Sequence, residues 1–274
     1  MHGDAMPQYD FHDVSILIPV RIENEDRLAN LEAVLRYFDT FFLHHETVLV
    51  ETGPESKCRH LGESPGVLFE FIAYDGPFWK TRLLNRALAA STRDIVAMHD
   101  ADTLFNPDAL NAMATAFRRF PDVVFGIPHN GTCLDVGGSA RQRLLETLDF
   151  STVPFVEEGE VHRRYGEDVV CTSPYAAGGA NYYRKTTLLE LGGFNESFQS
   201  HGWEDFEIEA RFVKMGYPPC VIKDSNVLHL HHERGPDSRP GPAYDRNELL
   251  YRRIARMTRD QLEEYIRSGL RTLP

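Results

Sequence analysis

The chain has 274 residues, of which 42% are hydrophobic and 26% charged, as in globular proteins with one large core or two small ones. Its formal net charge of −12 argues against a nucleic-acid groove or an anionic membrane surface as a partner. The four cysteines form no Cys-x-x-Cys motif, and neither a signal segment nor an apolar run of about 18 residues is visible. We therefore expect a cytoplasmic protein without a structural zinc site or a membrane span.

Strands alternate with helices in the prediction for the first half of the chain. The apolar run at 14–20 is typical of a parallel strand buried on both faces, and helical spacing of apolar residues follows at 24–37. Further strands are expected at 47–50, 67–72, 95–98 and 123–127, and further helices at 79–90 and 107–119. This alternation indicates βαβ units and a mainly parallel sheet.

The second half is less regular. The segment 128–174 holds a helix at 141–148 but otherwise has weak periodicity, so we expect either a flap over a substrate or a static insertion packed on the core. Beyond it, we expect helices at 184–191, 203–215 and 244–269, and a strand at 220–230. Thr258 and Gln261 form a capping box within the last helical stretch.

Two aspartates, Asp100 and Asp102, follow the strand at 95–98, at the edge where open α/β sheets bind ligands. Two such carboxylates repel each other unless a cation lies between them. A divalent metal that carries a diphosphate suits this position, because hard cations take oxygen ligands and leave positions for phosphate. The alternative is a solvated acidic turn, since Asp-x-Asp is common by chance.

Other polar residues are expected at the same edge of the sheet. Lys80 follows Phe78 at the start of a helix, and a helix N-terminus suits a phosphate, although a surface lysine is the alternative. Glu204 and Asp205 lie in the first turn of the helix at 203–215, where the helix dipole favours carboxylates and would lower the pKa of Asp205.

Three histidines, His229, His231 and His232, lie at the end of the strand expected at 220–230. A period of two places His229 and His231 on one face and His232 on the other. Imidazole together with carboxylate is a normal site for a transition metal. Solvent-exposed histidines are the alternative.

Taken in order, these segments resemble a glycosyltransferase of the GT-A fold, close to the family 2 type and to the galactosyltransferase type of family 7. The segment 17–21 with Glu25 resembles the nucleotide-binding signature of the first strand, 78–85 resembles the segment before the metal motif, and 100–102 matches the DxD motif. The most specific block runs from the Gly-Gly-Ala-Asn of 178–181 through Gly-Gly-Phe-Asn-Glu to Gly-Trp-Glu-Asp at 202–205, and it resembles the acceptor side. The resemblance covers about residues 14–234.

The resemblance implies a GT-A (Rossmann-like) α/β fold, with a mixed, mainly parallel sheet flanked by helices and a C-terminal helical extension. The catalytic domain would span 1–243, with a nucleotide-binding half at about 14–127 and an acceptor-side half at about 128–243, and the extension would span 244–274. The implied activity is inverting and metal-dependent. It moves a sugar from a nucleotide-diphospho-sugar, which we expect to be a UDP-sugar, to a hydroxyl of a saccharide or other acceptor, with Mn²⁺ or Mg²⁺.

The resemblance also assigns roles to individual residues. Asp205 would be the base, and Glu204 would hold a sugar hydroxyl. The donor nucleotide or sugar would contact Pro19, Val20, Arg21, Glu51, Asp75, Phe78, Lys80, Asn85, Asp100, Ala101 and Gly179. The acceptor would contact Trp203, Asn181 and Tyr182. The metal would be bound by Asp102 with His229 or, in reserve, His231.

Two other functions compete with this interpretation. A sugar-phosphate nucleotidyltransferase needs a glycine-rich phosphate loop after the first strand, and 19–23 contains no glycine. A non-catalytic carbohydrate-binding relative has no need for Asp100, Asp102, Glu204, Asp205 and the histidines together. The pattern predicts no particular oligomeric state.

Overall fold

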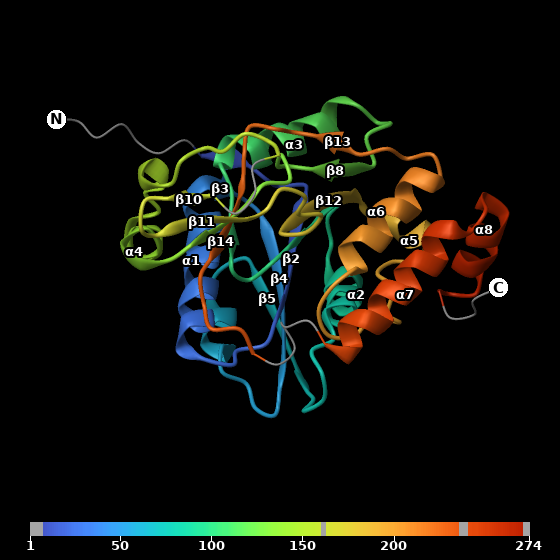
Figure 1. Ribbon diagram of the computed structural model, residues 1–274, viewed down its shortest axis with the longest axis horizontal. Coiled ribbons are helices and arrows are strands. Elements are labelled where there is room, and N and C mark those ends of the chain that lie inside the picture. Colours follow the sequence, from blue (N-terminus) through green and yellow to red (C-terminus); the bar gives the residue numbers. More distant parts are fainter. Residues whose placement is uncertain (1–7, 160–162, 236–240, 271–274) are drawn as a thin grey trace.

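The structure is a computed structural model that describes residues 8–159, 163–235 and 241–270, and its centre is a seven-stranded sheet (Figure 1). In spatial order its strands are β13 (Cys220–Val221), β8 (Phe125–Ile127), β12 (Ala180–Arg184), β6 (Ile95–His99), β2 (Val14–Val20), β4 (Glu46–Gly53) and β5 (Val67–Ala73). The neighbours β6, β2, β4 and β5 run parallel, whereas β12 is antiparallel to both β6 and β8. The sheet is therefore mixed and mainly parallel.

Helices cover both faces of this sheet (Figure 1). Helices α1 (Glu25–Phe41), α3 (Pro107–Arg119) and α4 (Gly138–Thr147) contribute to the core on one face, and α2 (Lys80–Ala90), α5 (Lys185–Glu190) and α6 (Glu204–Lys214) to the core on the other. Two single 3₁₀ turns, η1 (Arg59–Glu63) and η2 (Phe150–Thr152), complete this part. The expected α/β class, with a mostly parallel sheet flanked by helices, is confirmed.

Side-chain caps explain where α1 and α3 begin. The Asn24 side chain accepts a hydrogen bond from the backbone N–H of Arg27. The Asn106 side chain accepts one from the backbone N–H of Asp108, and Pro107 is the first residue of α3. An N-cap of this kind satisfies one of the backbone donors that a helix N-terminus leaves without a partner. Both helices therefore begin within a residue of the boundary that the sequence predicts.

A second sheet has five strands, in the order β10 (Arg164–Tyr165), β11 (Val169–Ser173), β9 (Cys133–Val136), β14 (Val227–Leu230) and β7 (Thr103–Leu104). Two further short strands, β1 (Tyr9–Asp10) and β3 (Phe42–Leu43), pair in parallel. The expectation that 128–174 is mostly irregular is wrong, because the segment supplies three strands and the helix α4. Its side chains Leu134, Leu144 and Cys171 are fully buried. Strands of two to five residues are too short to give a clear periodicity.

Two other expectations for the second half fail. The single strand expected at 220–230 is split into β13 and β14, which belong to different sheets. The chain changes sheet at Ser225 and Asn226, which are buried and hydrogen-bonded to Asn106 and Val156. Strand β12 was not predicted, because its sequence Ala-Asn-Tyr-Tyr-Arg neither alternates nor forms an apolar run.

The C-terminal helices α7 (Pro242–Arg256) and α8 (Arg259–Arg267) are present as expected, and the capping box of Thr258 and Gln261 is confirmed. They share a small core with Phe198, and α7 packs against α6. Asn247 of α7 donates hydrogen bonds to the carbonyls of Gln199 and Gly202, at 2.9 and 3.1 Å, in the loop that leads into α6. Within the described ranges, no helix is both long and apolar enough to cross a bilayer.

Candidate active site

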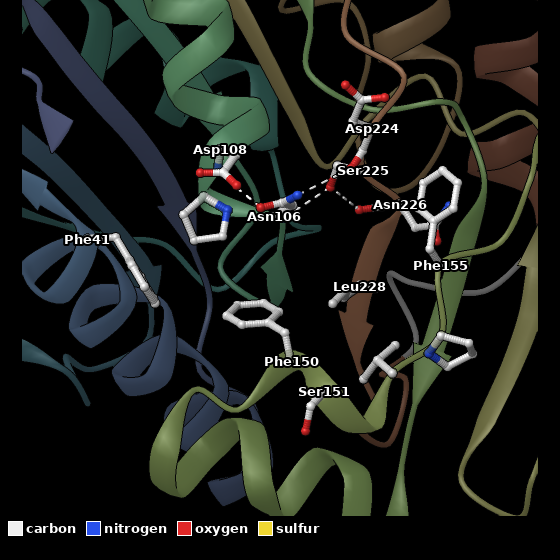
Figure 2. A pocket seen from close by; sticks show the side chains of 13 residues that line it. Phe41, Asn106, Asp108, Phe150, Ser151, Phe155, Asp224, Ser225, Asn226 and Leu228 are labelled. Atoms are coloured by element: carbon white, nitrogen blue, oxygen red, sulfur yellow. Dashed lines mark hydrogen bonds between the residues drawn. The ribbon is translucent and has the colours of Figure 1, made fainter. Parts of the chain in front are cut away.

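An apolar cavity and a polar site lie on opposite sides of β14. The cavity has a volume of about 520 Å³ and is walled by rings such as Phe150 and Phe155, with Asn106 and Ser225 at one end (Figure 2). Leu228 lines the cavity, and the next residue along the strand, His229, points to the other face. The cavity is lined by none of the predicted site residues. Several predicted site residues gather instead in two charged clusters on the other side of β14.

One cluster gathers three carboxylates around a single lysine. Lys80 is the first residue of α2, and its Nζ lies 2.9 Å from Asp100 Oδ1, 3.4 Å from Asp205 Oδ2 and 3.7 Å from Glu204 Oε1. Asp100 directly follows β6, and Glu204 and Asp205 open α6. We call Asp100, Glu204 and Asp205 with Lys80 the lysine cluster. It brings together four residues that the sequence assigned to the donor and to catalysis.

Glycines allow these elements to approach closely. A Cβ on Gly178 would lie 2.2 Å from Asp205 Oδ2, so only a residue without a side chain fits beside that carboxylate. Gly179 has a φ of +99°, and its carbonyl accepts a hydrogen bond of 2.9 Å from the backbone N–H of Asp100. The Gly-Gly pair thus holds the start of β12 against the C-terminal end of β6 and the N-terminal end of α6.

The charges of the lysine cluster are strongly coupled. Burial would lower the pKa of Lys80, but Asp100, Asp205 and Glu204 outweigh it and raise that pKa well above its usual value. Burial raises the pKa of Asp205 to about 7, since Lys80 only partly offsets burial and the neighbouring carboxylates. The expectation that the helix N-terminus lowers this pKa is wrong, because burial among carboxylates is the stronger effect.

Two atoms at the start of α6 have no hydrogen-bond partner within the described part of the chain. They are Glu204 Oε2 and Trp203 Nε1, and both are buried. Trp203 precedes the helix with a φ of 75°, and its ring stacks on Tyr251 of α7 at 5.1 Å. A buried polar atom without a partner is costly, so these two atoms are suited to receive the polar groups of a ligand.

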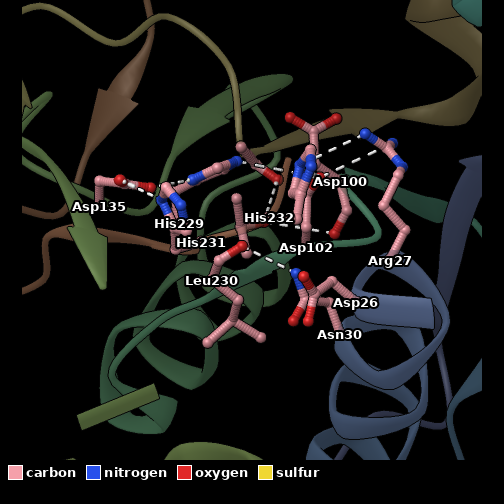
Figure 3. A network of polar contacts seen from close by, with 12 residues as sticks. Asp26, Arg27, Asn30, Asp100, Asp102, Asp135, His229, Leu230, His231 and His232 are labelled. Carbon is pink, nitrogen blue, oxygen red and sulfur yellow. Dashed lines mark hydrogen bonds and ion pairs between the residues drawn. The ribbon is translucent and has the colours of Figure 1, made fainter. Parts of the chain in front are cut away.

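The second cluster lies beyond Asp102. Asp102, His229 and His232 each offer one ligand atom, and these atoms lie within 4.8 Å of one another (Figure 3). Asp102 Oδ2 is 3.0 Å from His232 Nε2 and 4.0 Å from His229 Nε2. We call Asp102, His229 and His232 the histidine cluster.

Hydrogen bonds fix how the two imidazoles face Asp102. His229 Nδ1 donates to Asp135 Oδ1 at 2.7 Å, and His232 Nδ1 donates to the carbonyl of Glu233 at 2.9 Å. His232 Nε2 lies within hydrogen-bond distance of Asp102 Oδ2, and Asp135 and Asp102 raise the pKa of His229 against the effect of burial. A bound metal would replace the proton on Nε2, leaving each ring neutral with its proton on Nδ1 and an Nε2 lone pair beside the Asp102 carboxylate. Two lone pairs beside a carboxylate form a donor set for a divalent cation, and the imidazoles favour a transition metal such as Mn²⁺ over Mg²⁺. The residues therefore fit the expected metal.

His232, rather than His231, joins Asp102 and His229. His231 does share a face with His229, since its Nδ1 contacts the other oxygen of Asp135 at 2.7 Å, but its side chain is 60% exposed and lies outside the histidine cluster. The reserve assignment of His231 to the metal is thus not supported by its position. Strand β14 ends at Leu230, so the alternation stops there and His232 turns back toward Asp102.

Two other predicted donor residues, Arg21 and Glu51, have structural partners. Arg21 donates to the carbonyl of Gly76 at 2.8 Å and stacks over Phe78. Glu51 is buried and accepts hydrogen bonds from the backbone N–H groups of Lys57 and Cys58, at 2.7 and 3.2 Å. Its oxygens thus shape the loop after β4 rather than face a ligand.

The remaining predicted donor residues divide between turns and strand ends. Asn85 binds the 193–196 turn, with its Nδ2 2.8 Å from the carbonyl of Phe194. Asp75 is exposed on the loop after β5. Ala101 is buried between the two aspartates, and Pro19 and Val20 end β2 beside β4.

Two predicted acceptor residues are in the core. Asn181 and Tyr182 belong to β12, in the middle of the main sheet, and both are buried, to 0% and 1% exposure. Tyr182 packs toward Phe117 of α3. Their burial in a central strand that is covered on both faces does not support their assignment to the acceptor. Trp203 keeps its place beside Glu204.

Three residues of the site were not found from the sequence. Asp135 is the only carboxylate of the short strand β9. Its role depends on the pairing of β9 with β14, which places Asp135 opposite His229. His232 was placed on the wrong face. Arg27 lies in an acidic helix start that gives no sequence signal of a ligand, but its Nη2 is 3.8 Å from Asp102 Oδ2 (Figure 3).

The sequence matches two family models. The model for glycosyl transferase family 2 matches residues 15–167, and the model for glycosyl transferase family group 2 matches residues 95–262. Each covers more than half of the chain, and the two overlap across both aspartates that follow β6. No curated protein sequence matches this chain significantly.

Solved structures share the arrangement of elements at low identity. A mannosyltransferase from Pyrobaculum calidifontis, in complex with GDP-Man and Mn²⁺, is 16% identical with a TM-score of 0.51, over 97% of this chain and 76% of that one. The catalytic domain of a Drosophila beta-1,4-galactosyltransferase 7, in complex with xylobiose, is 14% identical with a TM-score of 0.47, over 92% and 83%. At 16% identity, the structural similarity to the mannosyltransferase shows a common fold only, and this fold is GT-A.

Proposed function

The chain belongs to glycosyl transferase family 2, and from that premise we propose that it moves a sugar from a UDP-sugar to a hydroxyl group of a saccharide, with inversion and with Mn²⁺. Family membership selects nucleotide-sugar-dependent glycosyl transfer over the nucleotidyl transfer and the non-catalytic binding that the sequence left open. The donor sugar, the acceptor and the stereochemistry are our proposal.

One observation carries the proposal. The segment 100–102 turns its two aspartates into different clusters, Asp100 to Lys80 at 2.9 Å and Asp102 to the two imidazoles. The histidine cluster would hold a cation that binds the diphosphate, and the lysine cluster holds a candidate base. Only the buried Ala101 separates the two in the chain. Glycosyl transfer needs both functions side by side, since a leaving group and an acceptor act on the same carbon.

The lysine cluster supplies the acid–base chemistry. Asp205, whose pKa is raised to about 7, takes the proton of the acceptor hydroxyl on a carboxylate oxygen. That hydroxyl oxygen forms a bond to the anomeric carbon of the donor while the bond from this carbon to the diphosphate oxygen breaks on the opposite side, which inverts the configuration. Glu204 Oε2 accepts a hydrogen bond from a sugar hydroxyl, and the ammonium group of Lys80 favours the ionised form of the base.

The histidine cluster holds the leaving group. Asp102, His229 and His232 would bind the metal, and Asp135 would orient His229. When bound, a divalent metal supplies Lewis-acid neutralisation of the departing diphosphate. The mannosyltransferase of the same fold is described with a nucleotide sugar and Mn²⁺, which supports the choice of metal but suggests GDP-sugars as the second donor class to test.

We place the catalytic domain at 1–243, and the extension at 244–274 supports the loop before α6. Because the cysteines are all unpaired, the cytoplasm is the compartment we propose.

The test is a donor and acceptor screen. Purified protein is incubated with several UDP- and GDP-sugars and Mn²⁺, with and without saccharide acceptors, and donor consumption and products are measured by NMR. We expect one UDP-sugar to be consumed faster with an acceptor, and the product to have the anomeric configuration opposite to that of the donor. Retained configuration would refute inversion, and consumption of GDP-sugars alone would refute the choice of donor.

A further inference from the structure

A second cation faces the same atoms that a metal would take. Arg27 lies in the first turn of α1, and its side chain is only 13% exposed. Its Nη1 is 3.3 Å from His232 Nε2, and its Nη2 is 3.8 Å from Asp102 Oδ2 (Figure 3). Both contacted atoms belong to the histidine cluster.

The contact with His232 is a direct competition. His232 donates through Nδ1 to a backbone carbonyl, and its other nitrogen, Nε2, lies 3.0 Å from Asp102 Oδ2 and 3.3 Å from Arg27 Nη1. A metal ion binds through the Nε2 lone pair and takes the space beside it, so it can bind His232 only after the guanidinium of Arg27 has moved away. Arg27 cannot lose its charge near neutral pH, so it must find another partner.

The charges indicate what that partner is. With neutral imidazoles, Asp102 and Asp135 supply two negative charges, whereas Arg27 and a divalent ion supply three positive ones. The combination calls for an additional anion beside the metal. A guanidinium presents a planar fork that fits two oxygens of a phosphate group.

The anchoring of Arg27 allows such an exchange. Its backbone N–H is held by Asn24, and its Nε donates to the carbonyl of Arg21 at 3.2 Å. The stem is thereby fixed, and the two terminal Nη groups face the histidine cluster. Only these two groups need to change partners, whereas Lys80 is engaged by three carboxylates.

We propose that Arg27 is a diphosphate-binding residue that moves its Nη groups from Asp102 and His232 to phosphate oxygens of the donor when the metal enters. This rests on the proposed function, because it takes the ligand to be a nucleoside diphosphate. Metal and nucleotide then bind as a pair. The diphosphate draws Arg27 away from the metal ligands, and the metal releases Arg27 to bind the diphosphate. Arg27 hinders a bare metal ion and assists the metal–nucleotide complex.

Two binding measurements test this with opposite expected signs. The affinity for Mn²⁺ alone is measured by electron paramagnetic resonance of the free ion, and the affinity for UDP, GDP and inorganic pyrophosphate at saturating Mn²⁺ is measured by calorimetry. We expect Arg27→Met to bind Mn²⁺ alone roughly 3- to 10-fold more tightly, because a like charge is removed. We expect it to bind the diphosphates roughly 10- to 100-fold more weakly, because charge-assisted hydrogen bonds are lost.

Arg141→Met is the matched control. Arg141 is 15% exposed and contacts Asn30 and Asp26 of the same helix, but neither Asp102 nor His232. It should change neither affinity by more than about twofold. Arg27→Lys keeps the charge without the fork, so it should bind Mn²⁺ alone like the wild type and bind the diphosphates with intermediate affinity.

The outcomes separate the two proposals. If Arg27→Met weakens both affinities, or leaves diphosphate binding unchanged while the wild type binds Mn²⁺ with UDP or GDP, the role of Arg27 is refuted. If the wild type binds Mn²⁺ and pyrophosphate but neither nucleotide, and transfers no sugar, the proposed function is refuted while the Arg27 comparison with pyrophosphate still stands. Thermal unfolding checks that each variant is folded.

Discussion

Asp100 and Asp102 follow the same strand and are separated by one residue, yet they have opposite environments. Asp100 faces the ammonium group of Lys80, in a cluster where three carboxylates share one lysine. Asp102 faces two imidazoles and a guanidinium, and these neighbours, with His232 foremost, outweigh burial and hold its pKa far below the usual range. One cluster is short of positive charge and the other is well supplied with it.

This difference determines which chemistry each cluster suits. A shortage of cations raises the pKa of Asp205 to about 7 and produces a group that can exchange a proton near neutral pH. A carboxylate that stays ionised beside two imidazoles is suited to bind a metal. The same edge of the sheet therefore separates proton transfer from metal binding by the choice of neighbouring side chains.

The largest expected effect comes from removing the base. Asp205→Asn should lower turnover by about 10²–10⁴-fold, because the acceptor hydroxyl loses its proton acceptor. Donor affinity should change little, since the histidine cluster is intact. Steady-state kinetics and calorimetry measure the two quantities. Glu204→Gln is the matched variant, and it should mainly raise the KM for the acceptor or donor sugar.

The assignment within this pair can be reversed by experiment. Both carboxylates reach Lys80, so the structure alone gives each of them the same neighbour. If Glu204→Gln loses turnover while Asp205→Asn keeps it, Glu204 is the base. Full activity in both variants would contradict the inverting mechanism.

The second effect concerns the orientation of His229. Asp135→Asn should lower the affinity for Mn²⁺ by about 10–100-fold, because the carboxylate no longer fixes the proton on Nδ1. His231→Ala removes the other histidine that contacts Asp135 and should change the affinity much less, since His231 is outside the cluster. Equal losses in the two variants would mean that Asp135 only holds the strands together.

The third effect is a pH dependence of the lysine cluster. Because Asp205 acts as a base with a pKa of about 7, turnover should fall about tenfold per pH unit below that value and level off above it. Removal of the lysine in Lys80→Met should move this limb to higher pH, since Lys80 lowers the pKa of Asp205. A limb that stays in place would show that another group titrates.

The smallest effect is on stability. The pKa of Asp205 is raised from 3.8 to about 7 by folding, so its stabilising contribution is complete below about pH 4 and lost as the pH rises toward 7. Asp205→Asn has no carboxyl group to titrate at this position. The difference between its Tm and the wild-type Tm should therefore be a few degrees more positive at pH 8 than at pH 4. A difference that does not change with pH would contradict the buried charge.

Much of the main sheet could be predicted, because several of its buried strands are apolar runs in the sequence and some of its flanking helices begin at recognisable cap residues. Strand β2 is an unbroken apolar run, and Asn24 and Asn106 mark helix starts by a local hydrogen bond. The five-stranded sheet could not be predicted in the same way. Its strands are short and pair with partners distant in sequence, as His229 of β14 does with Asp135 of β9.

The site follows the same division. Lys80, Asp100, Glu204 and Asp205 sit at strand ends and helix starts, so their convergence follows from the topology. His232 was misplaced because one residue decides where an alternating pattern stops. Arg27 carried no signal, since its position depends on how α1 faces the end of β14, through contacts such as Asn30 with the carbonyl of Leu230 at 2.8 Å.

The most direct test of the account is calorimetry of UDP and GDP with and without Mn²⁺, on the wild type and on Asp102→Ala. We predict that Mn²⁺ strengthens binding of one nucleotide by at least tenfold in the wild type, and that this gain disappears in Asp102→Ala while the protein remains folded. Wild-type affinities for both nucleotides that do not change with Mn²⁺ would contradict the account.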